Sequence, residues 1–181
     1  VYAVRVKLFM LLERFASCGA GMNSRGKLVV RGVRPNDAED LKRFWLELAE
    51  EMYKIEGYLL PSAANAETWL SYVLKEVKES RADVLVAQRG TELVGFIHLA
   101  YLTREMYETA RNMAVIHDMY VKPIYRSLGI GTMLMKEEMK RVKDKGVKQV
   151  RLSVLSENVG AVKFYERHGF KVYRYVMRKE I

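Results

Sequence analysis

The sequence predicts one domain of mixed α/β (α+β) structure in which a sheet is flanked by helices. The chain has 181 residues, the length of a single domain, and half of them are apolar, which is enough for a substantial core. Short β-rich runs and segments of helical periodicity follow the order strand, helix, helix, hairpin, strand, helix, strand, helix, strand. This order differs from the regular strand and helix alternation of a dinucleotide-binding domain.

We interpret residues 1–27 as an N-terminal extension and linker, and residues 28–181 as the domain proper. The apolar run 8–12 follows basic residues as in a signal peptide, but Glu13 and Arg14 interrupt it and no small-residue cleavage site follows at the right distance. No run of eighteen apolar residues occurs, so we expect no membrane span. The single cysteine, Cys18, excludes an internal disulfide and favours a reducing, cytoplasmic location.

The first half of the domain predicts a strand followed by two helices. The strand covers 28–34, and Asn36 or Asp37 can cap a helix that runs to about Tyr53. Residues 56–61, which include a glycine and a proline, break this helix, and apolar residues at helical spacing predict a second one over 66–80.

The middle of the chain predicts three strands. Residues 83–88 and 93–101 form a hairpin around the turn 89–92, and 113–121 is the central strand. The polar stretch 103–112 is either a helical turn or a long loop. His98 lies inside a strand with no second His or Cys at metal-ligand spacing, so we predict no metal site.

The last third predicts two helices, each followed by a strand. Helical periodicity over 132–145 ends at Gly146, and alternation predicts a strand over 148–155. Ser156 or Asn158 caps the next helix, which ends at Gly169. Residues 170–179 alternate again and predict a final strand.

The junction between the central strand and the following helix suits a phosphate group. The first N–H groups of a helix lack intrahelical partners, and the helix dipole adds positive potential there. Gly129 and Gly131 let a phosphate approach the main chain, and Arg126 adds a fork of donors. A Walker loop is excluded because Gly131 is not followed by Lys. A dinucleotide fingerprint lacks its third glycine at Leu134, although Glu157 keeps that alternative open.

The run 126–131, Arg-Ser-Leu-Gly-Ile-Gly, resembles the Q/R-x-x-G-x-G/A motif of the GCN5-related N-acetyltransferase (GNAT) family. Residues 116–123 are similar to that family's central strand and its exit, and residues 158–170 to its late helix. The resemblance covers 28 to the C-terminus and is strongest over 114–170. It implies an acyl-CoA N-acyltransferase fold with a central mixed, mostly antiparallel sheet flanked by helices. The family often has glycine where this chain has Ser127.

The resemblance also implies an activity and a set of site residues. It implies that the enzyme transfers the acetyl group of acetyl-CoA to a primary amine without a covalent intermediate. Tyr165 is the candidate acid, because a phenol with a pKa of about 10 is protonated at neutral pH. The implied contacts with acetyl-CoA are Met119, Tyr120, Val121, Arg126, Ser127, Leu128, Gly129, Ile130, Gly131, Thr132 and Asn158. Among them, the backbone N–H of Val121 or of Met119 is the candidate donor to the oxyanion.

The group that removes the amine proton stays open. His117 is the first candidate because an imidazole titrates in the useful range, and Asp118 or a water relay are the alternatives. Neighbouring residues of a regular strand point to opposite faces, but a β-bulge here would change that parity.

The remaining expectations concern partners. The net charge of +9 is partly explained by the phosphates of coenzyme A, and we expect no nucleic-acid binding because no reader module occurs. The acceptor is a small amine, such as a polyamine, or a peptide amine, and candidate contacts are Glu56, Tyr58, Glu105 and Glu108. A homodimer stays open. The alternatives are a non-catalytic acyl-CoA-binding or protein-interaction module of the same fold, or a dinucleotide-binding enzyme.

Overall fold

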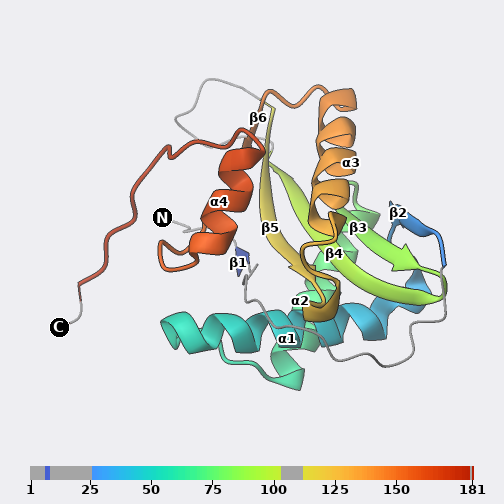
Figure 1. The fold of residues 1–181 in the computed structure, drawn as a ribbon, viewed down its shortest axis with the longest axis horizontal. Coiled ribbons are helices and arrows are strands. Elements are labelled where there is room, and N and C mark those ends of the chain that lie inside the picture. The colour runs from blue at the N-terminus through green and yellow to red at the C-terminus, as the bar shows by residue number, and fades with distance from the viewer. Residues whose placement is uncertain (1–6, 9–25, 103–111, 180) are drawn as a thin grey trace.

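The structure, a computed structural model, describes residues 7–8, 26–102, 112–179 and 181, and it is built on a six-stranded sheet (Figure 1). The strands follow the order β1-β5-β4-β3-β2, and β6 also pairs with β5. Their bounds are β1 Lys7–Leu8, β2 Leu28–Gly32, β3 Ala82–Arg89, β4 Glu92–Leu102, β5 Met113–Val121 and β6 Gln149–Arg151. Strands β2 to β5 are antiparallel, whereas β1 and β6 run parallel to β5, so the sheet is mixed and mostly antiparallel as predicted.

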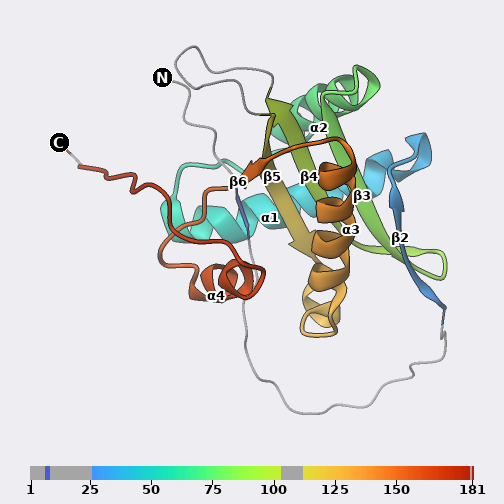
Figure 2. The ribbon, with the colours of Figure 1, turned by 90° about the horizontal axis from the view of Figure 1, so that it is seen from above.

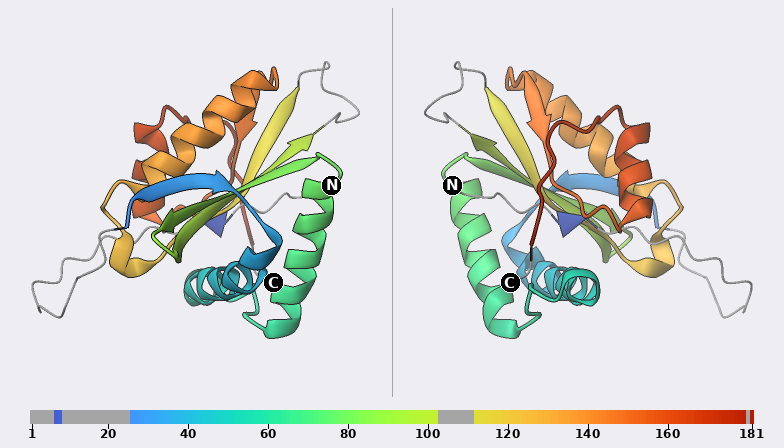
Figure 3. Two further views of the ribbon diagram at one scale, coloured as in Figure 1. Left: turned by 90° about the vertical axis from the view of Figure 1, so that its right-hand side faces the viewer. Right: turned by 90° about the vertical axis from the view of Figure 1, so that its left-hand side faces the viewer.

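Two helices cover each face of the sheet (Figures 2 and 3). Helices α1 (Ala38–Glu56) and α2 (Ala63–Lys78) pack on one face, where Val84, Val86 and Phe96 point. Helices α3 (Ile130–Asp144) and α4 (Val159–Arg167) pack on the other face, where Leu85 and Ile97 point. Because side chains alternate along β3 and β4, these strands contribute residues to two hydrophobic cores, one on each face of the sheet.

The helix ends follow the capping chemistry of the sequence. The Oγ of Ser62 accepts a hydrogen bond from the N–H of Asn65 at the start of α2. Gly57 and Gly146 adopt left-handed conformations after α1 and α3, which a residue without Cβ does at little cost. The predicted helices are confirmed, although α1 extends three residues beyond Tyr53 and α2 begins at Ala63 rather than Ala66.

Two predictions about strands are wrong. The strand expected over 148–155 is reduced to Gln149–Arg151, and the strand expected over 170–179 is absent. That segment has no regular structure, and Tyr175, Val176 and Met177 are all more than 80% exposed. The alternating pattern indicates a chain that can form a strand, but these residues pair with none of the described strands. The predicted polar stretch 103–112 lies almost wholly outside the described residues.

Candidate active site

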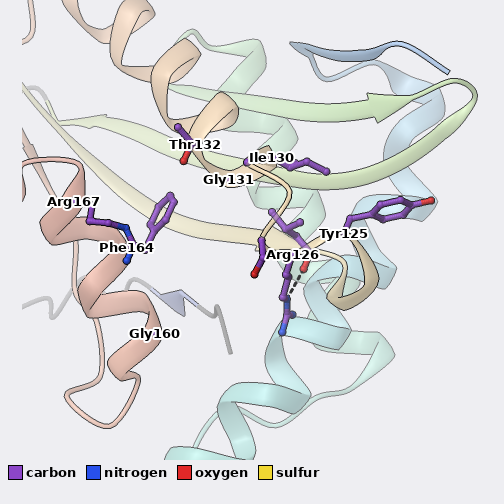
Figure 4. A pocket seen from close by; sticks show the side chains of 11 residues that line it. Tyr125, Arg126, Ile130, Gly131, Thr132, Gly160, Phe164 and Arg167 are labelled. Carbon is purple, nitrogen blue, oxygen red and sulfur yellow. Dashed lines mark hydrogen bonds between the residues drawn. The ribbon is translucent and has the colours of Figure 1, made fainter. Parts of the chain in front are cut away.

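A cavity of about 370 Å³ opens where the end of β5, the loop after it and the start of α3 face α4 (Figure 4). Side chains from three elements line it, because the sheet brings the end of β5 beside two helices that are distant in sequence. The lining residues are Val121, Tyr125, Arg126, Ser127, Gly129, Ile130, Gly131, Thr132, Gly160, Phe164 and Arg167. The structure thus brings together seven of the residues predicted to contact a cofactor.

The loop enters α3 through two residues with positive φ. Ser127 has φ +62° and Gly129 has φ +82°, with a short 3₁₀ turn over Pro123–Tyr125 before them. No side chain caps α3 at Gly129, and the N–H of Met133 donates to the carbonyl of Gly129. The preceding N–H groups have no acceptor within the helix, so this wall of the cavity offers backbone donors and the positive end of a helix dipole.

Gly131 allows the start of α3 to pack closely on β5 and α4. A Cβ at this position would lie 3.3 Å from Cε of Met119 and 3.4 Å from a ring carbon of Phe164. The glycine therefore keeps the cavity wall in contact with the core below it.

Arg126 is held by protein groups on both sides of the loop. Its guanidinium donates to both carboxylate oxygens of Glu51 on α1, at 2.9 and 3.0 Å, and its Nε donates to the carbonyl of Val121 at 2.8 Å (Figure 4). Burial raises the pKa of the Glu51 carboxyl, and the attraction of Arg126 opposes this rise. Arg126 thus anchors the loop to α1 and β5, in addition to any contact with a ligand.

Arg167 is a second cation at the cavity, and the motifs of the sequence do not identify it. It lies near the end of α4 with an exposed side chain and makes no hydrogen bond or ion pair with the part of the chain that the structure describes. Its only sequence signal is its position two residues after Tyr165 in the late helix. Its free guanidinium faces the same cavity as the start of α3 (Figure 4).

Tyr165 is buried behind the cavity wall. Only 2% of the residue is exposed, and its ring packs edge-to-face with the rings of Phe164 and Phe170. Its hydroxyl has no hydrogen-bond partner among the described residues. Burial, helped by the negative charge of Asp118, raises the pKa of Tyr165 well above its ordinary value, so the phenol is protonated at any physiological pH.

A β-bulge places His117 and Asp118 on the same side of β5. His98 pairs with Asp118 and Leu99 pairs with Ile116, so His117 is the extra residue of the bulge. Asp118 accepts a hydrogen bond from His98, and His117 stacks on the same His98 ring at 5.2 Å between centroids. Burial and the nearby His98 lower the pKa of His117 to about 4, so its imidazole is neutral at pH 7.

Four predicted contact residues lie outside the cavity lining. Met119 packs in the core beneath Gly131, and Leu128 is 60% exposed. Tyr120 lies on the opposite face of the sheet, where its hydroxyl donates to Glu47. Asn158 caps α4, because its side chain accepts a hydrogen bond from the N–H of Ala161.

The remaining candidates lie away from this cavity. Tyr58 is 54% exposed beside the guanidinium of Arg178, and Glu56 is the last residue of α1. Glu105 and Glu108 lie outside the described residues. Glu157 is exposed and accepts a hydrogen bond from Ser156. The mixed, mostly antiparallel sheet is not that of a dinucleotide-binding domain.

No group of three or more His, Cys, Asp or Glu side chains in the described part of the chain could hold a metal ion. Among its helices, none combines the length and the apolar character needed to cross a membrane.

Comparison with known proteins gives consistent matches. A model described as "Acetyltransferase (GNAT) family" matches residues 41–170. Spermidine N(1)-acetyltransferase of Thermoplasma acidophilum is 30% identical over 150 residues, which cover 77% of this chain and 88% of that protein. Thialysine N-epsilon-acetyltransferase of Bos taurus is 31% identical over 150 residues, which cover 78% of this chain and 83% of the relative.

Solved structures share the fold at lower identity. A Bacillus halodurans protein superposes with a TM-score of 0.75 at 19% identity, covering 84% of this chain and 99% of the other. An aminoglycoside acetyltransferase from an uncultured soil sample, solved with sisomicin, gives a TM-score of 0.62 at 18% identity, covering 85% of this chain and 95% of the other. These likenesses concern the arrangement of helices and strands.

Proposed function

Because this chain belongs to the acetyltransferase (GNAT) family and is an acetyl-CoA-dependent N-acetyltransferase, we propose that it acetylates a primary amine by direct attack in a ternary complex. The acceptor is a small amine, such as a polyamine, or a peptide amine. The names of two relatives, which act on spermidine and thialysine, support a small amine. The observation that carries the proposal is the buried Tyr165 hydroxyl, which has no partner among the described residues.

The cavity at the start of α3 binds the phosphates of acetyl-CoA in this proposal. The N–H groups of Ile130, Gly131 and Thr132 supply neutral donors, and the helix dipole favours the negative charge. Arg167 supplies a full positive charge that no described carboxylate already neutralises. Ser127, Gly129 and Val121 complete the wall, and Arg126 keeps the loop in place through Glu51.

Tyr165 is the acid that serves the leaving group. Attack of the amine on the thioester forms the C–N bond, and collapse of the tetrahedral intermediate breaks the C–S bond and releases a thiolate. The Tyr165 O–H donates its proton to that sulfur and is later reprotonated from solvent. A hydroxyl that is already buried without an acceptor loses no hydrogen bond when it turns to the sulfur. A backbone N–H of β5, at Val121 or at Met119, donates to the oxyanion.

His117 accepts the proton of the amine in this proposal, directly or through water. Its low pKa of about 4 keeps the imidazole unprotonated at pH 7 and therefore available as an acceptor. The same low pKa means that it holds the proton only briefly and passes it to solvent. Asp118 or a water relay could take this role instead, and the exchange of His117 for Gln separates the alternatives by its effect on turnover.

The binding half of the proposal is tested by calorimetry with acetyl-CoA and with CoA. We expect micromolar binding to the wild-type protein and its loss in Gly129→Glu, because a carboxylate would occupy the phosphate cradle. Circular dichroism must show that the variant is folded. No heat with folded wild-type protein would contradict the proposal.

The catalytic half is tested by Tyr165→Phe, which removes one oxygen and keeps the ring. We expect turnover to fall by about 10²–10⁴-fold, while the affinity for acetyl-CoA and the stability stay the same or rise slightly. Turnover within twofold of the wild type would remove Tyr165 from the mechanism. An amine screen that finds binding of acetyl-CoA but no turnover by the wild type would favour the non-catalytic module.

A further inference from the structure

A polar cluster lies on the α2 side of the β5 bulge, and it is formed by the buried His98 and Asp118 and the partly buried Trp69 and His117. The indole Nε1 of Trp69 donates to Oδ2 of Asp118 at 3.0 Å, and Nδ1 of His98 lies 2.9 Å from the same oxygen. His98 is 3% exposed and Asp118 is 7% exposed. A carboxylate at this depth is costly unless its charge and its lone pairs are satisfied.

The two hydrogen bonds fix the orientation of the carboxylate and leave one oxygen unused. Both end on Oδ2, and Oδ1 accepts no hydrogen bond from the residues that the structure describes. No Lys or Arg in those residues forms an ion pair with Asp118. The side chain keeps 10% exposure, so the unused oxygen can be reached from outside. The carboxylate therefore offers one lone-pair face to a donor that the described residues do not supply.

The neighbours of Asp118 are arranged to keep this oxygen free. His98 cannot turn toward Oδ1 without leaving its place between the ring of His117, at 5.2 Å, and the edge of Trp69, at 6.3 Å. Trp69 is itself held by stacking on Trp45 at 6.0 Å and by the edge of Phe96 at 5.6 Å. The donors are thus fixed by packing rather than by the carboxylate alone.

We propose that Oδ1 of Asp118 binds the ammonium group of the acceptor, and that Trp69 and His98 are positioning residues which hold the carboxylate for it. This rests on the proposed function, since it names the group that the acetyltransferase site recognises. A single free oxygen suits the compact point charge of a primary ammonium. A guanidinium, which binds carboxylates through two parallel hydrogen bonds, finds only one oxygen. The acceptor class is therefore an alkyl primary amine rather than an arginine-like group.

The geometry also explains how the bound amine reaches its base. The bulge puts His117 beside Asp118 on one side of β5, so an ammonium on Oδ1 lies next to the neutral imidazole. The cluster thus places the bound amine beside the group proposed to accept its proton.

The two tryptophans of the chain provide a direct readout of this contact. The protein has only Trp45 and Trp69, so a ¹⁵N correlation spectrum contains two indole N–H signals, and Trp69→Phe identifies one of them. We expect n-butylammonium to shift the Trp69 signal in the CoA-bound and in the free protein, and to leave the Trp45 signal in place. We expect n-butanol and n-butylguanidinium to bind at least tenfold more weakly, and Asp118→Asn to abolish the shift.

Kinetics with spermidine as the probe acceptor separates positioning from general stability. Trp69→Phe keeps the ring contacts and removes one of the two donors to Asp118, so we expect KM for the amine to rise about tenfold with KM for acetyl-CoA unchanged. Trp45→Phe is the matched control, because it alters the stacked neighbour without touching the carboxylate, and it should stay within twofold of the wild type. His98→Asn, which can still donate to Oδ2, should restore part of what His98→Leu loses.

Several outcomes would overturn the proposal. These are an unshifted Trp69 signal, a shift that persists in Asp118→Asn, equal binding of n-butanol, or equal effects of Trp69→Phe and Trp45→Phe. The failure of the proposed function is a different result, namely no calorimetric binding of acetyl-CoA. The ammonium titration of the free protein does not depend on that binding, so the two failures can be told apart.

Discussion

Gly57 and Gly129 form a natural pair for measuring what the left-handed backbone contributes at the site. Both have positive φ, +70° and +82°, and a Cβ at either would meet nothing within 4 Å. At each position there is room for a methyl group, but the left-handed backbone conformation is unfavourable for a residue with a Cβ. Gly57 ends α1, whereas Gly129 begins α3 at the cavity wall.

We expect Gly129→Ala and Gly57→Ala to lower the free energy of unfolding by a similar amount, about 1–2 kcal/mol each, because the left-handed conformation costs an alanine that much. Only Gly129→Ala should also weaken acetyl-CoA binding, since strain there shifts the loop. Urea unfolding and calorimetry measure the two effects. Equal loss of affinity in both variants would show that the effect is general instability.

At the scale of single residues, the sequence identifies candidate site residues better than it identifies the residues that contact them in the fold. Arg126 stands out in the loop motif, but Glu51, which holds its guanidinium, is 75 positions away in the chain. The alternation of side chains along a strand does not reveal a β-bulge. The sequence therefore does not determine the face of the sheet on which His117 and Asp118 lie, whereas the pairing with β4 does. Arg167 was missed because an exposed arginine near a helix end is common.

At the scale of single elements, the segment 170–179 is the clearest failure of sequence pattern. Its residues have the β-rich alternation of a strand, and the first of them, Phe170, packs on Tyr165 in the core. Farther along, the Arg151 guanidinium lies 4.8 Å from the ring centre of Tyr173, and that of Arg178 lies 5.2 Å from that of Tyr58. Local pattern specifies the conformation a segment prefers, while pairing depends on an edge supplied by the rest of the fold. The interior strands β3, β4 and β5, which have neighbours on both sides, were predicted nearly to the residue.

Deleting residues 171–181 should therefore have little effect on the stability of the chain. We expect a fall of about 1 kcal/mol, or roughly 2–4 °C in Tm, because exposed cation–π contacts contribute about 0.5–1 kcal/mol each. Scanning calorimetry measures it, and sedimentation compares the assembly state of the two forms. A fall beyond 10 °C would show that this segment is paired in solution, and a simultaneous change from dimer to monomer would identify a second copy as the partner.

At the scale of the whole molecule, two buried groups set opposite dependences of stability on pH. His117 has its pKa lowered by burial to about 4 from 6.5, so the folded protein binds fewer protons and loses stability as pH falls from 6.5 toward 4. Glu138 on α3 is fully buried, with neither carboxylate oxygen hydrogen-bonded to a described residue. Burial, with a contribution from Asp83, raises its pKa to about 8 from 4.5, so stability falls as pH rises from 4.5 toward 8.

These two groups cancel between about pH 4.5 and 6.5, where each changes stability by up to about 1.4 kcal/mol per pH unit in opposite directions. Above pH 6.5 only Glu138 acts, and we expect the free energy of unfolding to fall by about 2 kcal/mol by pH 8. Glu138→Gln should remove this fall and expose the rise between pH 4 and 6.5 that His117 causes. Urea unfolding at pH 5, 6.5 and 8 measures both. A decline above pH 6.5 that persists in Glu138→Gln would assign it to another group.

The order of the sheet makes the two walls of the cavity differ in how firmly they belong to the fold. Strands β3, β4 and β5 are consecutive in the chain and adjacent in the sheet, so their contacts are local and their amides belong to the most cooperative part of the fold. Helix α4 is the last element in the chain, and it packs on the core through Ala161, Phe164 and Tyr165. We therefore expect the wall at β5 to belong to the slowest-exchanging unit and the wall at α4 to open locally more often. A ligand that spans both walls would protect the amides of α4 from hydrogen exchange far more than those of the sheet.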